Sequence, residues 1–111
     1  MARVVALVPD LFFAAKVRET LTSAGHEVEL VRTHAEAVGA DADLVIVDLD
    51  ADDINSGVLV SDLLGTPTLG FYSHVNEETK HAGRLAGIDV VVPRSRMARE
   101  MPKLVENLVA S

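Results

Sequence analysis

The sequence contains no cysteine and no tryptophan. The absence of cysteine excludes disulfide bonds, catalytic thiolates and cysteine-based zinc sites, and it fits a reducing compartment. Aromatic residues are few, with three phenylalanines and one tyrosine, although 49% of the chain is hydrophobic. The core must therefore consist mainly of valine, leucine, isoleucine and alanine, a composition typical of parallel strands that helices cover on both faces.

Positive charge is also in deficit. Ten Lys and Arg residues stand against 17 Asp and Glu residues, which gives a formal net charge of −7. A nucleic-acid-binding surface needs a clustered positive field, so the sequence predicts no nucleic-acid partner. No apolar run approaches the ~18 residues of a membrane span, and the segment before Pro9 lacks the features of an export signal. We therefore expect a cytoplasmic protein with no membrane partner.

Motifs of the common enzyme classes are missing as well. The first apolar run leads into Pro9-Asp-Leu-Phe-Phe13 rather than a glycine-rich turn, which excludes dinucleotide and P-loop sites. The sequence has no G-x-S-x-G nucleophile elbow. We expect a protein that is not an enzyme.

Five short apolar runs alternate with segments of helical character along the chain. The runs cover residues 4–8, 28–31, 44–47, 68–71 and 90–92. Most of them are continuously apolar, which favours a sheet buried on both faces. Strands that alternate with helices form right-handed crossovers and one parallel sheet. The sequence therefore predicts a single α/β domain over residues 1–111, a doubly wound, flavodoxin-like three-layer sandwich with strand order 2-1-3-4-5.

Apolar residues between the runs recur at helical spacing. Phe13, Val17 and Leu21 form the first stripe, and Gly25 closes that helix as a C-cap. Further helices are expected over residues 34–40, 54–64 and 76–86.

The last helix bears on assembly. Its apolar stripe consists of Met97, Met101, Leu104 and Leu108. Pro102 is expected in its first turn, where the missing N–H costs little. Val105 and Val109 make the stripe wider than one sheet face requires, and exposed apolar surface often marks a contact site. We therefore predict a weak homodimer, or a partner surface, on the face formed by the fourth helix, fifth strand and fifth helix.

Two carboxylates stand where a ligand site is expected. In an open α/β sheet, ligands bind beyond the carboxyl ends of the strands, at the point where strand order reverses. For the predicted order this point lies between the first strand, which leads to Asp10, and the third, which leads to Asp48. Either acid alone could simply begin a loop or cap a helix. As a pair, they indicate a functional site. Asp50, Asp52 and Asp53 are read as solvated loop charges.

Further polar side chains follow the fourth and fifth strands. Ser73 and His74 come after the fourth strand, and Arg94 and Arg96 come after the fifth. Together they could hold a small anion. The plainer alternative makes His74 a loop residue and leaves both arginines solvated or paired with acids.

Several segments resemble response-regulator receiver domains. They are Val17, Leu21, Gly25 and Val28 around the first turn, Asp43-Leu-Val-Ile-Val-Asp48, Thr66-Pro67 before the fourth strand, and Gly87-Ile-Asp-Val-Val-Val92 at the fifth. The resemblance implies a phospho-acceptor aspartate after the third strand and two acids after the first strand for Mg²⁺. It also implies a hydroxyl after the fourth strand and a lysine after the fifth.

The match to this pattern is partial. Asp48 falls at the phospho-acceptor position and Asp10 at the second acid, but Pro9 stands at the first acid and Arg94 at the lysine. Either Tyr72 or Ser73 falls at the hydroxyl. A metal site would rest on Asp10 and Asp48, although one of the loop acids Asp50, Asp52 and Asp53 could replace the acid that the pattern lacks at Pro9. Arg94 could instead form a permanent salt bridge to Asp48 and hold one state without phosphate.

Three functions remain open. The first is a degenerate, stand-alone receiver-like module of two-component signalling that works through protein contacts and needs no cofactor. The second is a working response regulator, phosphorylated on Asp48 with Mg²⁺, whose partner is a histidine kinase or an output protein. The third is a small-anion or ligand-binding protein that uses the cluster of Ser73, His74, Arg94 and Arg96.

Overall fold

The computed structural model describes residues 2–73 and 77–110. The strands are β1 (Arg3–Leu7), β2 (Glu27–Val31), β3 (Leu44–Asp48), β4 (Thr68–Tyr72) and β5 (Val90–Pro93). The helices are α1 (Leu11–Ser23), α2 (His34–Gly39), α3 (Ser56–Asp62), α4 (Glu77–Leu85) and α5 (Arg94–Val109). All strand pairs are parallel and the sheet order is β2-β1-β3-β4-β5, which confirms the predicted fold class. Of the described helices, none has the length and apolar character needed to cross a membrane.

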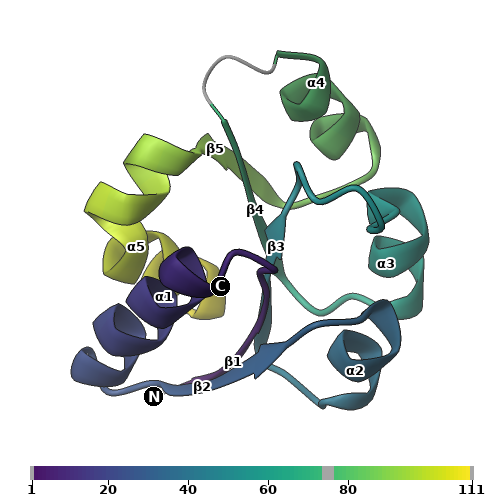
Figure 1. The fold of residues 1–111 in the computed structure, drawn as a ribbon. Coiled ribbons are helices and arrows are strands. Elements are labelled where there is room, and N and C mark those ends of the chain that lie inside the picture. Colours follow the sequence, from purple (N-terminus) through teal and green to yellow (C-terminus); the bar gives the residue numbers. More distant parts are fainter. Residues whose placement is uncertain (1, 74–76, 111) are drawn as a thin grey trace.

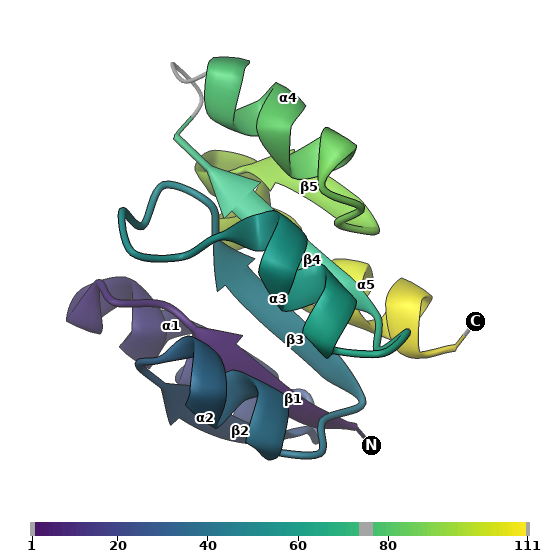
Figure 2. The same cartoon turned by 90° about the vertical axis from the view of Figure 1, so that its right-hand side faces the viewer.

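Helices cover both faces of the sheet (Figures 1 and 2). Helices α1 and α5 lie together on one face, and α2, α3 and α4 lie on the other. Successive strand residues point to opposite faces, so Val4 and Ala6 of β1 belong to the core under α1 and α5, whereas Val5 and Leu7 belong to the core on the other face. The continuous apolar runs of the sequence reflect this burial on both sides.

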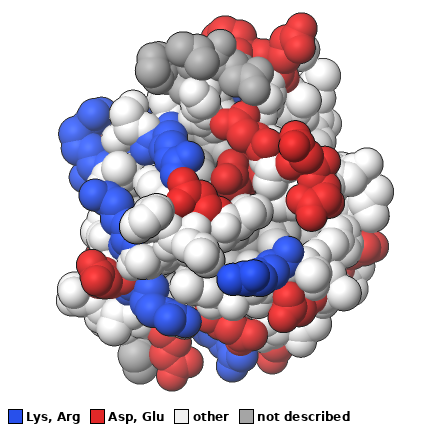
Figure 3. Space-filling view, viewed as in Figure 1, with Lys and Arg blue, Asp and Glu red and all other residues white. Residues whose placement is uncertain are grey.

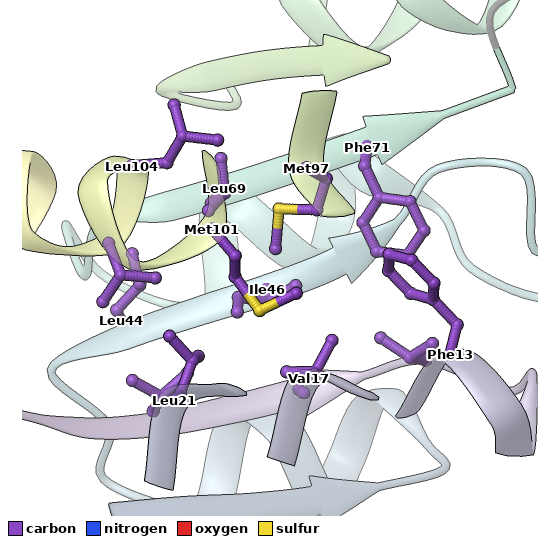
Figure 4. Close-up of a cluster of buried hydrophobic side chains, with 14 of the residues drawn as sticks. Phe13, Val17, Leu21, Leu44, Ile46, Leu69, Phe71, Met97, Met101 and Leu104 are labelled. Atoms are coloured by element: carbon purple, nitrogen blue, oxygen red, sulfur yellow. The ribbon is translucent and has the colours of Figure 1, made fainter. Parts of the chain in front are cut away.

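The core under α1 and α5 is the larger of the two clusters (Figure 4). Its labelled side chains are Phe13, Val17, Leu21, Leu44, Ile46, Leu69, Phe71, Met97, Met101 and Leu104. The first stripe predicted from the sequence, which ends at Gly25 with a positive φ of 93°, therefore faces the sheet as expected. Met97 and Met101 belong to the same cluster as Phe13 and Phe71, and their flexible side chains fill irregular space there.

Helix α5 differs from its prediction. It begins at Arg94, directly after β5, and consists of two helical segments that meet at a kink at Glu100. Pro102 therefore lies within α5 as a whole, but in the first turn of the segment that follows the kink. Proline lacks the N–H that would bond to the carbonyl of Ala98, and its ring crowds that carbonyl. Glu100 accordingly has the non-helical angles φ −120° and ψ 16°, and the helix is kinked there.

The predicted apolar surplus on α5 is also wrong. Val105 is fully buried, with 0% exposed, and Val109 is partly buried against the same cluster. The reason is that α5 packs against α1 as well as against the sheet, so it needs a wider apolar face than the sheet alone requires. The apolar argument for a dimer through α4, β5 and α5 therefore loses its basis.

Candidate functional site

The carboxyl ends of the strands bring four polar residues to one edge of the sheet. Asp10 follows β1, Asp48 ends β3, Ser73 follows β4 and Arg94 follows β5. The charges of Asp10 and Arg94 both act on the pKa of Asp48, so the three groups interact electrostatically. This is the edge at which the sequence predicts a site.

Asp48 is held in a buried position. The residue is 8% exposed, and its Oδ1 accepts a hydrogen bond from the backbone N–H of Asp50 at 3.0 Å. Burial raises the pKa of the Asp48 carboxyl above its usual value, because the charged form loses solvation. The carboxylates of Asp50 and Asp10 act in the same direction, and the Arg94 charge opposes them. The site therefore disfavours the carboxylate form of Asp48.

Asp10 has two roles. Its Oδ1 accepts hydrogen bonds from the backbone N–H groups of Phe12 at 3.0 Å and Phe13 at 3.3 Å, which caps α1. Its Oδ2 accepts a hydrogen bond from Nη2 of Arg94 at 2.5 Å, in an ion pair whose side chains are each 40% exposed. The bond from Arg94 is the main reason that the pKa of Asp10 lies below its usual value, and the Phe13 N–H adds to it.

The Arg94 guanidinium is also held by two aromatic rings. Its Cζ lies 4.4 Å from the ring centroid of Phe13 and 5.9 Å from that of Phe71. The two rings contact each other, with centroids 4.8 Å apart. A cation over such faces is attracted by the ring quadrupole. The stack keeps Arg94 on the α1 side of the site, so Arg94 pairs with Asp10, and the expectation of a salt bridge to Asp48 is wrong.

Asp50 ties the loop after β3 to the end of β4. Its Oδ2 accepts a hydrogen bond from the backbone N–H of Ser73 at 2.6 Å. Asp50 is exposed, as expected for a solvated loop charge, and in addition its side chain holds backbone at the site.

Sequence comparisons find no match for this chain, either among protein-family models or among curated proteins. Solved structures do match it. The receiver domain of the Francisella response regulator 1452 aligns over 99% of this chain and 98% of its own length, with 16% identity and a TM-score of 0.84. The chemotaxis response regulator CheY4 of Vibrio cholerae aligns over 97% and 98%, with 24% identity and a TM-score of 0.81. The HemR receiver domain of Leptospira biflexa aligns over 100% and 96%, with 20% identity and a TM-score of 0.80. This chain has the receiver-domain fold.

Within the receiver fold, the candidates after β4 and β5 divide into separate groups. Tyr72 is the last residue of β4 and is 4% exposed, whereas Ser73 follows it, half-buried, and contributes its backbone N–H to Asp50. Arg96 pairs with Glu100 at 3.4 Å, one turn along α5. His74 lies outside the described residues. The structure thus brings Arg94 to the acids and commits Arg96 to its own helix.

A divalent metal ion does not fit the site of this receiver fold as it stands. Position 9 is a proline and supplies no carboxylate, Asp10 is bonded to a guanidinium, and Asp50 holds Ser73. Over residues 2–73 and 77–110, no three His, Asp or Glu side chains converge as a metal-binding group. Mg²⁺ needs oxygen ligands in near-octahedral geometry, and a cationic side chain already lies against one of the two candidate acids.

Two features of the site escape the sequence-based predictions. One is the stack of Arg94 on Phe13 and Phe71. The signal for it was present, because Phe13 lies three residues after Asp10 and Phe71 lies near the end of β4, so both reach the same edge. The other is Leu49, whose side chain packs tightly against Gly70 of β4 and Gly83 of α4.

Proposed function

We propose that this chain is a degenerate receiver-like signalling module that acts through protein contacts, in which the Arg94 guanidinium takes the position of a divalent cation. The observation that carries the proposal is the Arg94–Asp10 ion pair stacked on Phe13. We further propose that residues 1–111 form one such unit, that it performs no turnover, and that its partner is a protein such as a histidine kinase or an output protein.

The physical argument starts from what phosphorylation of a carboxylate requires. A divalent ion must offset the charge that accumulates when an anionic acceptor meets a phosphoryl group. Asp10, a candidate ligand, is bonded to a guanidinium that stays charged at all physiological pH values. Asp48, the candidate acceptor, is 8% exposed, and its Oδ1 already accepts a hydrogen bond from the backbone N–H of Asp50. Both features favour a static charge arrangement over acyl-phosphate chemistry.

Leu49 gives the site a mechanical link to a protein-contact surface. It directly follows Asp48, and its backbone N–H donates to the carbonyl of Phe71 at 2.9 Å. A Cβ added at Gly70 would lie only 2.8 Å from Cδ1 of Leu49, and a Cβ added at Gly83 would lie 2.7 Å from the same atom. A displacement of Asp48 would therefore press Leu49 against α4. We propose that a partner bound at α4 senses the acidic site in this way.

A magnesium titration with a restored variant tests the proposal. We expect amide spectra of the wild-type protein to show no saturable response of Asp10 and Asp48 to Mg²⁺. The double variant Pro9→Asp, Arg94→Lys returns an acid and a compact ammonium, and we expect it to bind Mg²⁺ at these residues. Arg96→Lys is the matched control, since Arg96 pairs within α5 and its replacement leaves the site unchanged. Saturable Mg²⁺ binding by the wild type at Asp10 and Asp48 would contradict the proposal.

One observation favours a second candidate, a phosphorylated response regulator. Asp48 ends β3 at the carboxyl edge of a receiver fold, next to the ends of β1 and β4. This candidate requires Arg94 to leave Asp10 when a metal ion and a phosphoryl group arrive. It predicts stoichiometric labelling of Asp48, which the degenerate module does not undergo.

A further inference from the structure

One large apolar side chain at the start of α1 is almost completely exposed. Phe12 is 91% exposed and its neighbour Leu11 is 66% exposed, whereas Phe13 fills the core. Phe12 therefore contributes little to the packing of this chain. Exposed aromatic surface of this kind commonly marks a contact site, because docking it removes about 150–250 Å² from water.

The helix surface behind Phe12 carries two cations and one acid, Glu19. Lys16 follows Phe12 by one turn on the same face, and Arg18 stands two turns from Leu11. In the described part of the chain, neither cation forms an ion pair. Helices α1 and α5 together carry six of the ten Lys and Arg residues but only three of the 17 acids. The molecule is therefore basic on this layer although its net charge is −7.

A groove of complementary character lies between α3 and α4, on the opposite layer. It has a volume of about 390 Å³, near the lower end of the range for ligand pockets, roughly 300–1,000 Å³. Leu49 and Ile54 supply apolar surface, and Gly57 and Gly83 have no side chains that would narrow the groove. Space for an aromatic ring is therefore available between the two helices.

The surroundings of this groove are acidic. Asp52 and Asp53, both exposed, directly precede Ile54, and the exposed Glu78 lies in the first turn of α4. Figure 3 shows acidic side chains gathered over the loop between β3 and α3, and basic ones over α1 and α5. An incoming apolar group flanked by cations would fit this groove in both shape and charge.

We propose that this protein self-associates, with Phe12 of one copy seated in the groove between α3 and α4 of a second copy. Lys16 and Arg18 then face the acids at the groove rim. The occupant is a second copy because one chain carries both the aromatic projection with its cations and a groove of mixed polarity, with Leu49 and Ile54 in its lining and acids beside it. The contact is small, so the association is weak and transient. The contact does not involve Val105. It does include Leu49 and α4, but its test measures association and not Mg²⁺ binding, so its failure can be told apart from failure of the proposed function.

A complementation experiment tests this directly. Phe12→Glu removes the projection, and Ala82→Trp fills the groove at an exposed position of α4. In sedimentation experiments, we expect the wild type to associate with increasing concentration and each variant alone to associate at least about 30-fold more weakly. An equimolar mixture of the two variants should form a one-to-one dimer, because one partner retains the groove and the other retains Phe12.

The controls are substitutions of the same kind elsewhere. Leu64→Glu changes a residue that is 90% exposed but does not line the groove, and Ala35→Trp enlarges an exposed alanine on α2. Both should associate like the wild type. Three results would overturn the proposal: a wild type that stays monomeric up to about 1 mM, unchanged association of Phe12→Glu, or a mixture of the two variants that remains monomeric. Binding of Phe12 to some other protein by a monomeric wild type would also count against self-association.

Discussion

The tight contact between Leu49 and Gly83 leads to a prediction with an unusual sign. Replacing a glycine inside a helix by alanine ordinarily stabilises it by about 1 kcal/mol, because glycine has the greater backbone freedom to lose. At Gly83 the new Cβ would lie 2.7 Å from Cδ1 of Leu49. The same Cδ1 lies 2.8 Å from the position that a Cβ would take at Gly70, so Leu49 fills the space that both glycines leave and must shift to admit the new methyl group.

The two effects can be weighed against each other. Overpacking of this kind costs about 1–3 kcal/mol, so we expect Gly83→Ala to destabilise the fold by about 1 kcal/mol after the gain in helix propensity. Gly57→Ala in α3 is the matched control, since its Cβ would meet its nearest neighbour, Oδ1 of Asn55, at an ordinary 3.5 Å. That variant should be more stable than the wild type by roughly 0.5–1 kcal/mol.

Urea unfolding of both variants, in the wild-type and Leu49→Ala backgrounds, measures these differences. Leu49→Ala removes the obstructing Cδ1, so in that background Gly83→Ala should stabilise the protein as Gly57→Ala does. The resulting interaction energy between positions 49 and 83 should be about 1–3 kcal/mol. If Gly83→Ala stabilised the wild type and the cycle closed without an interaction energy, Leu49 would not couple the acidic site to α4.

Three further predictions concern the site and the core. Asp48→Asn should stabilise the protein at pH 7. Because the folded pKa of Asp48 is raised, the stability that this carboxyl contributes is fully present below its unfolded pKa, near 3.8, and is lost as pH rises through the folded pKa. The urea midpoints of the variant and the wild type should therefore diverge from about pH 4 upward, and a difference that stays constant with pH would contradict the burial argument. Arg94→Ala should raise the pKa of Asp10 towards its usual value, as followed by carboxyl NMR titration, whereas Arg96→Ala should not. Val105→Glu should prevent folding, as seen by circular dichroism, because it buries a charge at a position that is 0% exposed; a folded variant with altered self-association would restore the α5 face as an interface.

Much of the fold could be predicted from the sequence because the signals were local and repeated. Five apolar runs separated by helical segments specify a parallel sheet, and the carboxyl-edge rule places Asp10 and Asp48 at one edge without any knowledge of side-chain conformation. The burial of α5 was misjudged at Val105, because the amount of apolar surface that a helix needs depends on how many elements pack against it.

The finer chemistry of the site depends on contacts that no sequence pattern contains. Which acid Arg94 bonds is decided by the Phe13 and Phe71 rings, which come from two elements far apart in the chain. The role of Asp50 depends on the path of the loop after β3, which brings it to the N–H of Ser73. These arrangements follow from tertiary packing, so residue type and spacing alone could indicate the location of the site but not its internal bonds.

The central claim is that Arg94 stands in for a divalent cation and that Asp48 does not form a durable acyl phosphate. The most direct measurement is the intact mass of the protein after incubation with Mg²⁺ and a small-molecule phosphoryl donor, with Asp48→Asn treated in parallel. We expect each protein to keep its own unmodified mass, with no phosphoryl adduct on either. A stoichiometric phosphoryl adduct on the wild type that is missing from Asp48→Asn would contradict it.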